Sequence, residues 1–468
     1  MTTRIDQPFT AADLSGLRSA CTGPVLTPDQ PGYADEVATW NLSVRLRPAV
    51  VVGAAGPDDV VAAVRWATER GLAIGVNATG HGAVPNADGA LLVSTRRMTS
   101  VRVDPVLGTA TVAAGARMRD VTAAAAPYGL APVQGSTGSA GAVGYTLGGG
   151  LGVMSRTFGL AVDHVTTIDV VTLDGRLRTV DADHDADLFW ALRGGRGNFG
   201  VVTSYRTMLQ RLSTFYGGGL FFDGADAGEV LHRYRAWIAD HSDRTSSSVA
   251  LLRLPPDPRL PEPIRGRFVA HLRMAHVGEP EEGSRLAGAM RASAPVLLET
   301  LGRLPTTALD AVHLDPVDPM PTHERGLLLD DLAAGVVEAV LARAGGAVEH
   351  PLVVTDLRNL GGAIARPPER PSAVPGRDAA ALLFTLAPAV PPLAEAGPRA
   401  VQALFDAVEP WRSTSTLPSF LGRSFRPADV QGAWPQASLD RLLAVKGAWD
   451  PANQLRVGHA LLGADDVG

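Results

Sequence analysis

The sequence is poor in residues that form cross-links or bind soft metals. Among its 468 residues there is a single cysteine, Cys21, so neither an intrachain disulfide nor a cluster of thiolate metal ligands can form. We predict no metal site. Lysine is as scarce as cysteine, because Lys446 is the only one and every other basic side chain apart from histidine is an arginine.

Long apolar runs and a strong charge of one sign are also absent. No stretch approaches the ~18 apolar residues of a membrane helix, and residues 1–17 lack the basic and apolar regions of a signal peptide. The net charge of −6 offers no footprint for nucleic acid or an anionic membrane. We expect a cytoplasmic protein, a monomer or homodimer, without nucleic-acid or membrane partners. A hydrophobic content of 46% and this length fit two or three globular domains.

Glycine is concentrated in one segment. Residues 135–165, GSTGSAGAVGYTLGGGLGVMSRTFGLAVDHV, contain nine glycines, too many for a stable helix or strand, since glycine costs about 1 kcal/mol in a helix interior. Apolar residues such as Tyr145, Leu147 and Leu151 run through the segment, which is not typical of a flexible linker. Bare backbone can approach a ligand closely. The segment therefore predicts a buried cradle for a large planar or phosphorylated ligand, although it matches neither a Walker loop nor a Rossmann fingerprint.

A second motif lies upstream, at the end of a predicted β-α-β unit. Residues 48–53 read as a buried strand, a helix begins near Pro57 and ends at Gly71, and residues 72–76 read as the next strand. This strand leads into residues 76–83, VNATGHGA, where His81 stands between two glycines. The local sequence alone leaves two interpretations of His81 open: an exposed turn residue, or a side chain held at a site by the bare backbone around it.

Three motifs together resemble a known family. LGGGLGVMSRTFGLAVDHV, VNATGHGA and, near the C-terminus, LDRLLAVKGAWDPANQLRVGHAL stand in the same order as in the berberine-bridge-enzyme-like oxidases of the vanillyl-alcohol-oxidase (PCMH-type FAD-binding) superfamily, in its bacterial secondary-metabolism type. The resemblance implies an α+β fold with a PCMH-type FAD-binding domain of two α/β subdomains in residues 1–212, its core at about 44–212. A substrate-binding domain, an antiparallel sheet covered by helices, is expected in residues 213–410. Residues 411–468 are expected to return to the FAD domain.

The resemblance also implies a covalent bond between His81 and FAD. Such a bond needs a neutral imidazole that is held in place, because the unprotonated ring nitrogen is the nucleophile. Many relatives add a second link through a cysteine, but Thr137 stands at that position, so we predict a single link. Further FAD contacts are predicted from the loop around His81, the glycine-rich segment, the strand after a second glycine loop at residues 194–200, and the C-terminal motif. They are Ala78, Thr79, Gly80, Gly82, Ala83, Thr137, Gly138, Ala140, Gly141, Val143, Gly144, Leu147, Gly148, Gly149, Gly150, Gly152, Ser155, Gly159, Asp163, Gly200, Val201, Val202 and Asn453.

The catalytic base of the family is missing. Its tyrosine would fall at Leu417, which cannot accept a proton. His459 is a candidate base or flavin contact, and a plain packing role for it stays open. Ala140 falls where relatives control the access of oxygen, and its small side chain favours an open path. Tyr145 and Asp163 are expected to support the loop. Residues 366–375 are expected to be a surface loop, and His350, Arg358 and Arg377 are expected to be solvated, with ligand contact as the alternative.

The expected activity follows from the resemblance. It implies an FAD-dependent oxidoreductase that oxidises an alcohol or amine of a small organic molecule, such as a natural product, with oxygen as acceptor and hydrogen peroxide as product. Two alternatives stay open: a flavoprotein for a redox-neutral cyclisation or an oxygenation, and a flavoprotein that sequesters a ligand without turnover.

Overall fold

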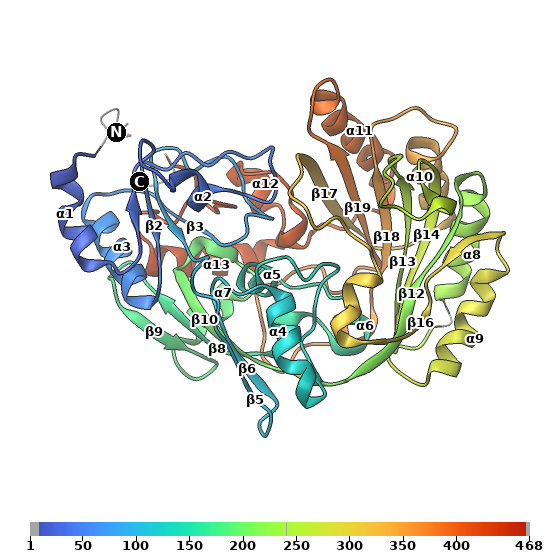
Figure 1. Ribbon diagram of the computed structural model, residues 1–468, viewed down its shortest axis with the longest axis horizontal. Coiled ribbons are helices and arrows are strands. Elements are labelled where there is room, and N and C mark those ends of the chain that lie inside the picture. Colours follow the sequence, from blue (N-terminus) through green and yellow to red (C-terminus); the bar gives the residue numbers. More distant parts are fainter. Residues whose placement is uncertain (1–8, 240, 465–468) are drawn as a thin grey trace.

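The chain folds into two halves, one of which contains a large antiparallel sheet (Figure 1). The computed structural model describes residues 9–239 and 241–464. Figure 1 shows the N-terminal elements and the C-terminal helices together in one half, and the strands of residues 214–388 in the other. The expected α+β fold, an FAD-type domain beside a helix-covered antiparallel sheet, is confirmed.

The first sheet of the N-terminal half is a small α/β layer. Its strands lie in the order β1 (Val25–Leu26), β2 (Val50–Gly53), β4 (Leu91–Ser94) and β3 (Ile74–Asn77). The strands β2, β4 and β3 are parallel, and α3 (Pro57–Glu69) begins with a proline and two acids, which suit a helix N-terminus. The helix packs its apolar stripe on the sheet beside α1 (Ala11–Ala20). This layer positions the loop that follows β3, which carries His81.

The second sheet of this half is antiparallel. Its order is β5 (Val101–Asp104), β6 (Thr109–Ala113), β10 (Val201–Met208), β8 (Val165–Val171) and β9 (Leu177–Val180). One apolar cluster joins it to α4 (Met118–Ala125), α5 (Ala142–Leu147) and α7 (Ala186–Leu192). Shorter elements complete the half: α2 (Tyr33–Val37), α6 (Ser155–Phe158), and the pair β7 (Leu130–Ala131) and β11 (Gln210–Arg211).

The C-terminal helices pack against this half. The helices α12 (Pro427–Gln431) and α13 (Gln436–Trp449) contribute Val430, Leu442 and Val445 to the same apolar cluster. The chain's only lysine, Lys446, is fully buried here. Its ammonium donates to Asp450 at 2.5 Å and to the carbonyls of Asn198 and Leu455. This ion pair fixes the turn after α13 to the loop before β10.

The large sheet is antiparallel and has two unlike faces. Its strands run β15 (Val296–Glu299), β12 (Thr214–Asp223), β14 (Phe268–His276), β13 (Thr245–Arg253), β18 (Val354–Asn359), β19 (Ala381–Pro388) and β17 (Thr322–Leu329), and β16 (Gly302–Pro305) also pairs with β12. One face is apolar and packs on α8 (Ala227–Ile238), α9 (Pro280–Arg291), α10 (Ala334–Ala344) and α11 (Leu393–Ala407), which lie on the side away from the N-terminal half in Figure 1. The opposite face carries polar side chains on its middle strands, among them Ser248, Arg273 and Asp356, between two smaller apolar clusters. We call it the polar face.

Three local predictions from the sequence are wrong. The glycine-rich segment forms two short helices, α5 and α6, because Ala142, Val143 and Leu147 pack one side of α5 into the core. The expected surface loop 366–375 is exposed at its start but buries residues 373–375 against the N-terminal half, where the Ala373 amide donates to Arg193. The helix α8 and the strand β17 were not expected at all.

No helix among the described residues is both long enough and apolar enough to cross a membrane.

Candidate active site

His81 and the glycine-rich segment meet in space although they are 58 residues apart. The His81 Nε2 lies 3.3 Å from the Ser139 hydroxyl, and Nδ1 lies 2.9 Å from the Thr79 hydroxyl. The Thr79 oxygen also accepts the amide N–H of Gly141 at 3.2 Å. On its face, the imidazole stacks on Trp40 with ring centres 4.9 Å apart and an angle of 13° between the rings. The ring is therefore held from three sides.

The His81 imidazole is neutral at ordinary pH. Burial, and to a lesser degree the positive charge of Arg117, lowers the pKa of His81 to about 4. Nucleophilic attack by imidazole requires the neutral form. The structure therefore provides a fixed, unprotonated ring nitrogen at the position where the sequence predicts flavin attachment.

The backbone around His81 suits a phosphorylated ligand. Within the described chain, no hydrogen bond takes up the amide N–H groups of Thr79, Gly80, His81 and Gly82. Consecutive free amides in a turn with a left-handed residue, here Gly80 at φ +73°, form a concave site for an anion. Nearby, Gly144 in α5 is exposed, and a Cβ added to it would meet nothing within 4 Å. The free amides and the open glycine face fit the pyrophosphate and the flat ring of FAD.

A largely buried cation stands beside this loop, and no carboxylate among the described residues pairs with it. The Arg196 guanidinium lies next to two glycines of the predicted cradle, since a Cβ at Gly82 or Gly148 would fall 3.0 or 3.2 Å from it. Among the described residues, its hydrogen-bond partner is the carbonyl of Pro418. Burial lowers the pKa of Arg196 to about 10. A buried charge is costly unless it is paired, so Arg196 is suited to an anionic ligand such as FAD.

The polar face of the large sheet lies opposite the cradle and carries a buried charge network. Asp356 on β18 is fully buried, and its Oδ2 accepts from Arg358 Nε at 2.8 Å and from Arg273 Nη1 at 3.1 Å. Burial alone would raise the pKa of Asp356, but the guanidiniums of Arg358 and Arg273 hold it below its ordinary value. In turn, Arg273 Nε donates to His271 Nδ1 at 3.2 Å. The carboxylate thus fixes both arginines in one orientation.

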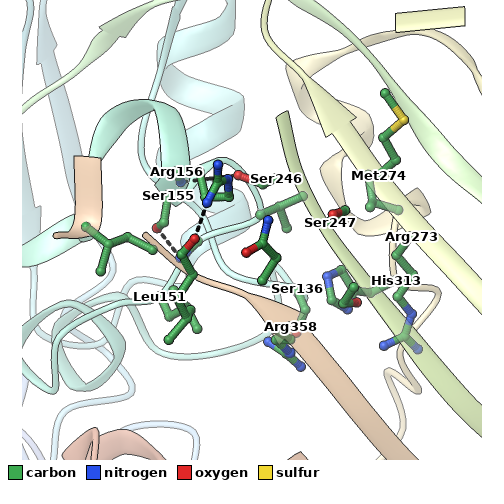
Figure 2. A pocket seen from close by; sticks show the side chains of 17 residues that line it. Ser136, Leu151, Ser155, Arg156, Ser246, Ser247, Arg273, Met274, His313 and Arg358 are labelled. Carbon is green, nitrogen blue, oxygen red and sulfur yellow. Dashed lines mark hydrogen bonds between the residues drawn. The ribbon is translucent and has the colours of Figure 1, made fainter. Parts of the chain in front are cut away.

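A narrow cavity separates this face from the glycine-rich segment. Figure 2 shows Ser155 and Arg156 on one side and Arg273, Met274 and Arg358 on the strands across from them. Burial, with Arg273 and Arg358, keeps the pKa of His313 well below its ordinary value. The prediction that Arg358 is a solvated surface residue is wrong, because its side chain is 13% exposed and faces this cavity. Arg377 is not solvated either, since it pairs with Asp163 at 2.5 Å.

Glu324 is a titratable residue of the polar face that the sequence did not single out. It pairs in register with Leu386 on β19, and Leu386 pairs with Val354, two residues before Asp356. Burial, and to a lesser degree Asp315, raises the pKa of Glu324 to about 7. A carboxyl with this pKa exchanges a proton near neutral pH. The segment that follows Leu417 packs beside it, since a Cβ at Gly422 would contact the carbonyl of Glu324.

His459, the predicted base, is buried and makes a hydrogen bond to the main chain. Its Nε2 lies 2.9 Å from the carbonyl oxygen of Gly422, and Nδ1 has no partner among the described residues. Burial, then the charge of Arg196, lowers the pKa of His459 to about 3. Leu417 is buried in an apolar cluster with Leu328 and Val374. His459 can therefore accept a hydrogen bond from a ligand but holds a proton weakly.

Several other residues predicted to contact FAD make hydrogen bonds or packing contacts within the described chain. The Asn453 amide donates to the carbonyls of Leu462 and Gly463, and a Cβ at Gly200 would collide with Val170 at 2.4 Å. The Tyr145 hydroxyl donates to the carbonyl of Val133, in a supporting role. Val201, Val202 and Leu147 are buried in apolar clusters. The predicted contact residues as a set stay a prediction.

Comparison with known proteins identifies the N-terminal half. Residues 48–181 match the family model described as FAD binding domain. This part of the chain is an FAD-binding domain. The protein is 34% identical over 194 residues to (R)-6-hydroxynicotine oxidase of Paenarthrobacter nicotinovorans, which covers 41% of this chain and 42% of that one. It is 35% identical over 188 residues to xylooligosaccharide oxidase of Thermothelomyces thermophilus, covering 39% and 38%. The matched region thus spans less than half the length of these relatives.

The fold comparison extends over nearly the whole chain. The crystal structure of 6-hydroxy-D-nicotine oxidase from Arthrobacter nicotinovorans superposes with a TM-score of 0.81 at 22% identity, covering 94% of this chain and 98% of that one. Xylooligosaccharide oxidase in complex with xylobiose, from Myceliophthora thermophila, gives 0.83 at 21% identity, covering 97% and 100%. The chain therefore has the fold of these FAD-linked oxidases over nearly its whole length, and the resemblance of its three motifs to FAD-linked oxidases of this fold is confirmed, without the secondary-metabolism type.

Proposed function

We propose that the protein is an FAD-dependent oxidase that acts on an alcohol or amine of a small organic molecule and releases hydrogen peroxide. The observation that carries the proposal is the junction of two distant motifs, where a neutral, fixed imidazole at His81 meets Ser139 and a row of free amides. The names of the relatives, oxidases of an amine-containing compound and of a carbohydrate, support the same class of reaction.

The residues that would hold FAD are those of the cradle. The amides of residues 79–82 and the Arg196 guanidinium would bind its negative charges, the open face of α5 at Gly144 would lie under the ring, and His81 would form the single covalent bond. When bound, FAD accepts a hydride from a substrate carbon and passes the electrons to oxygen. No thiol is present at Thr137 to form a second link.

The other half of the site would bind and orient the substrate. The polar face of the large sheet meets the glycine-rich segment across the cavity, and Asp310, on the short 3-10 helix between β16 and β17, binds the segment. Its carboxylate accepts from the Gly138 amide at 2.8 Å and from Gln134 Nε2 at 2.7 Å. This contact between the halves fixes the segment that carries Ser139, and a fixed geometry lowers the entropic cost of bringing substrate and cofactor together.

We assign proton transfer to Glu324. The strand register puts Glu324 on the same face of the sheet as Asp356, and its main-chain carbonyl lies beside Gly422, in the segment that follows Leu417. With a pKa of about 7, it takes the proton of a hydroxyl or ammonium group at neutral pH more readily than His459, whose pKa is about 3. The small side chain of Ala140, half-buried in the segment, leaves room for oxygen.

Two measurements test the proposal. Protein expressed with ample riboflavin should be yellow, and the colour should stay with the pellet after acid precipitation because the flavin is covalently bound. The His81→Ala variant should release the colour on precipitation, whereas His184→Ala, which changes an exposed histidine, should not. Colourless wild-type protein contradicts FAD binding, and wild-type colour in the supernatant contradicts the covalent bond.

The reaction class is tested with panels of alcohols and amines. An oxidase consumes oxygen and releases peroxide in proportion to substrate. A product of unchanged mass would indicate a redox-neutral cyclisation, incorporation of an oxygen atom would indicate an oxygenase, and tight binding without turnover would indicate sequestration.

A further inference from the structure

We infer that the substrate of this site carries a carboxylate, bound by the free end of Arg358 at the wall of the cavity. The inference rests on the proposed function, since it assigns a substrate class to the same site. The fold alone does not imply a carboxylate substrate, because the inference depends on particular side chains on the large sheet of this chain.

The cavity wall has three cations and no anion. Among the described residues that line it are Arg156, Arg273 and Arg358, and there is no aspartate or glutamate. The carboxylates that pair with these arginines are Asp356, Asp315 and Asp243, and none of the three lines the cavity. A ligand in the cavity therefore meets guanidinium groups directly.

Of the three arginines, Arg358 is the one whose terminal nitrogens are free. Arg156 spends its guanidinium on backbone carbonyls, among them those of Thr245 and Leu360. Arg273 donates to Asp356 and His271. Arg358 donates from Nε to Asp356 at 2.8 Å, and within the described chain no hydrogen bond takes up its Nη1 or Nη2. Asp356 therefore holds the Nε end of the guanidinium and leaves both terminal nitrogens available to a ligand in the cavity that Arg358 lines.

A second donor without a partner lies in the same wall. The side-chain nitrogen of Asn359 is buried and has no hydrogen-bond partner among the described residues, and it follows Arg358 directly in the chain. An unpaired buried donor costs about 1–3 kcal/mol, so a ligand acceptor is expected here. The rest of the wall mixes apolar side chains such as Leu151 and Val153 with polar ones, namely His313 and the serines at 136, 155 and 246–248. A small ligand with one planar, two-oxygen acceptor satisfies both free donors.

The planar fork favours a carboxylate over a neutral acceptor. Two parallel N–H donors of a guanidinium match the two oxygens of a carboxylate, and the charge strengthens both bonds. A carboxamide of the same shape keeps only one acceptor oxygen and no charge. The preference between such a matched pair of ligands thus measures the contribution of Arg358.

The test is calorimetric binding to the flavin-loaded protein with three matched pairs of probes: benzoate and benzamide, phenylacetate and phenylacetamide, cinnamate and cinnamamide. We expect the wild type to bind at least one acid about 10- to 100-fold more tightly than its amide. Arg358→Gln should remove this preference, Arg358→Lys should restore part of it, and Arg285→Gln, on the exposed side of α9, should leave it unchanged. Flavin content and circular dichroism confirm that each variant is folded.

Equal affinity for acids and amides in the wild type, or no binding of any acid at millimolar concentration, overturns the inference. So does a preference that survives in Arg358→Gln. These results leave the proposed oxidase standing if neutral alcohols or amines are turned over with peroxide release. Failure of the protein to bind FAD contradicts the proposed function instead, and is seen before any probe is added.

Discussion

The two halves of the site differ in what they offer a ligand: one offers mainly main-chain groups, and the other offers side chains. In the N-terminal half the ligand surface is mainly main chain: free amides at residues 79–82, an open glycine face at Gly144, and one histidine held between hydroxyls. In the large sheet the surface is made by side chains on alternate positions of antiparallel strands, and the charges of Arg273, Asp356 and Arg358 lie on one face. A main-chain site leaves a glycine pattern that is readable in the sequence. A side-chain site depends on register, which a single sequence does not reveal.

The largest effect is expected from a substitution on the large sheet, at Glu324. Glu324→Gln keeps the shape but removes the proton acceptor, so kcat should fall by about 10²–10⁴-fold, while covalent flavin content stays at the wild-type level. In the wild type, kcat/KM should fall as the pH drops below about 7, because the carboxyl becomes protonated. Steady-state kinetics between about pH 5 and pH 9 measures the loss of kcat in the variant and the pH dependence of kcat/KM in the wild type.

Glu338→Gln is the matched control, because Glu338 is exposed on α10 and faces away from the site. A Glu324→Gln variant that keeps full activity and the same pH profile would remove Glu324 from the mechanism.

The next prediction concerns the buried ion pair between Lys446 and Asp450, which lies in the half whose ligand surface is main chain. Lys446→Met leaves the Asp450 carboxylate buried without its cation, which should cost about 3–5 kcal/mol of unfolding free energy. Arg441→Met, on the same helix, breaks the exposed pair with Asp187 and should cost at most about 1 kcal/mol. Denaturant unfolding measures both. Equal costs for the two variants would show that the buried pair contributes no more than a surface one.

A smaller effect separates binding from folding in the main-chain half. Gly144→Ala replaces a glycine inside α5 with a better helix former, so the flavin-free protein should gain about 0.5–1 kcal/mol. The loading of FAD should nevertheless fall, because the new methyl group occupies the open face under the ring, and Gly144→Leu should reduce it further. Flavin absorbance per protein and thermal unfolding are the measurements.

Gly16 provides the control, since it lies within α1 and a Cβ there also meets nothing within 4 Å. Gly16→Ala and Gly16→Leu should leave FAD loading unchanged. Normal loading of Gly144→Leu would show that FAD does not cover this face.

The smallest effect concerns oxygen. Ala140→Leu should slow reoxidation of the reduced protein by oxygen, because the larger side chain narrows the path that the resemblance places there. Reoxidation by an artificial dye, which takes electrons at the exposed edge of the ring, should change less. Stopped-flow absorbance compares the two rates in one preparation. An equal decrease for both acceptors would point to a distorted site rather than a blocked path.

What the sequence predicted follows the same division. The β-α-β unit, the position of His81 and the glycine segment were recognised because strand, helix and turn signals are local. The helix α5 was missed because its stability comes from tertiary packing rather than from helix propensity. Arg358, Glu324 and Arg196 were missed or misjudged because their burial arises from contacts with residues distant along the chain, such as that of Arg196 with Pro418.

The enclosed lysine has a practical consequence for chemical labelling. Since Lys446 is the sole lysine of the chain and is fully enclosed in the folded molecule, reagents directed at lysine amines should find no target side chain on its surface. The fraction of Lys446 that is modified after a given time, measured by peptide mass spectrometry, would therefore report how often the C-terminal turn opens. The rate of uptake with and without flavin would then report how strongly the cofactor closes the fold around it.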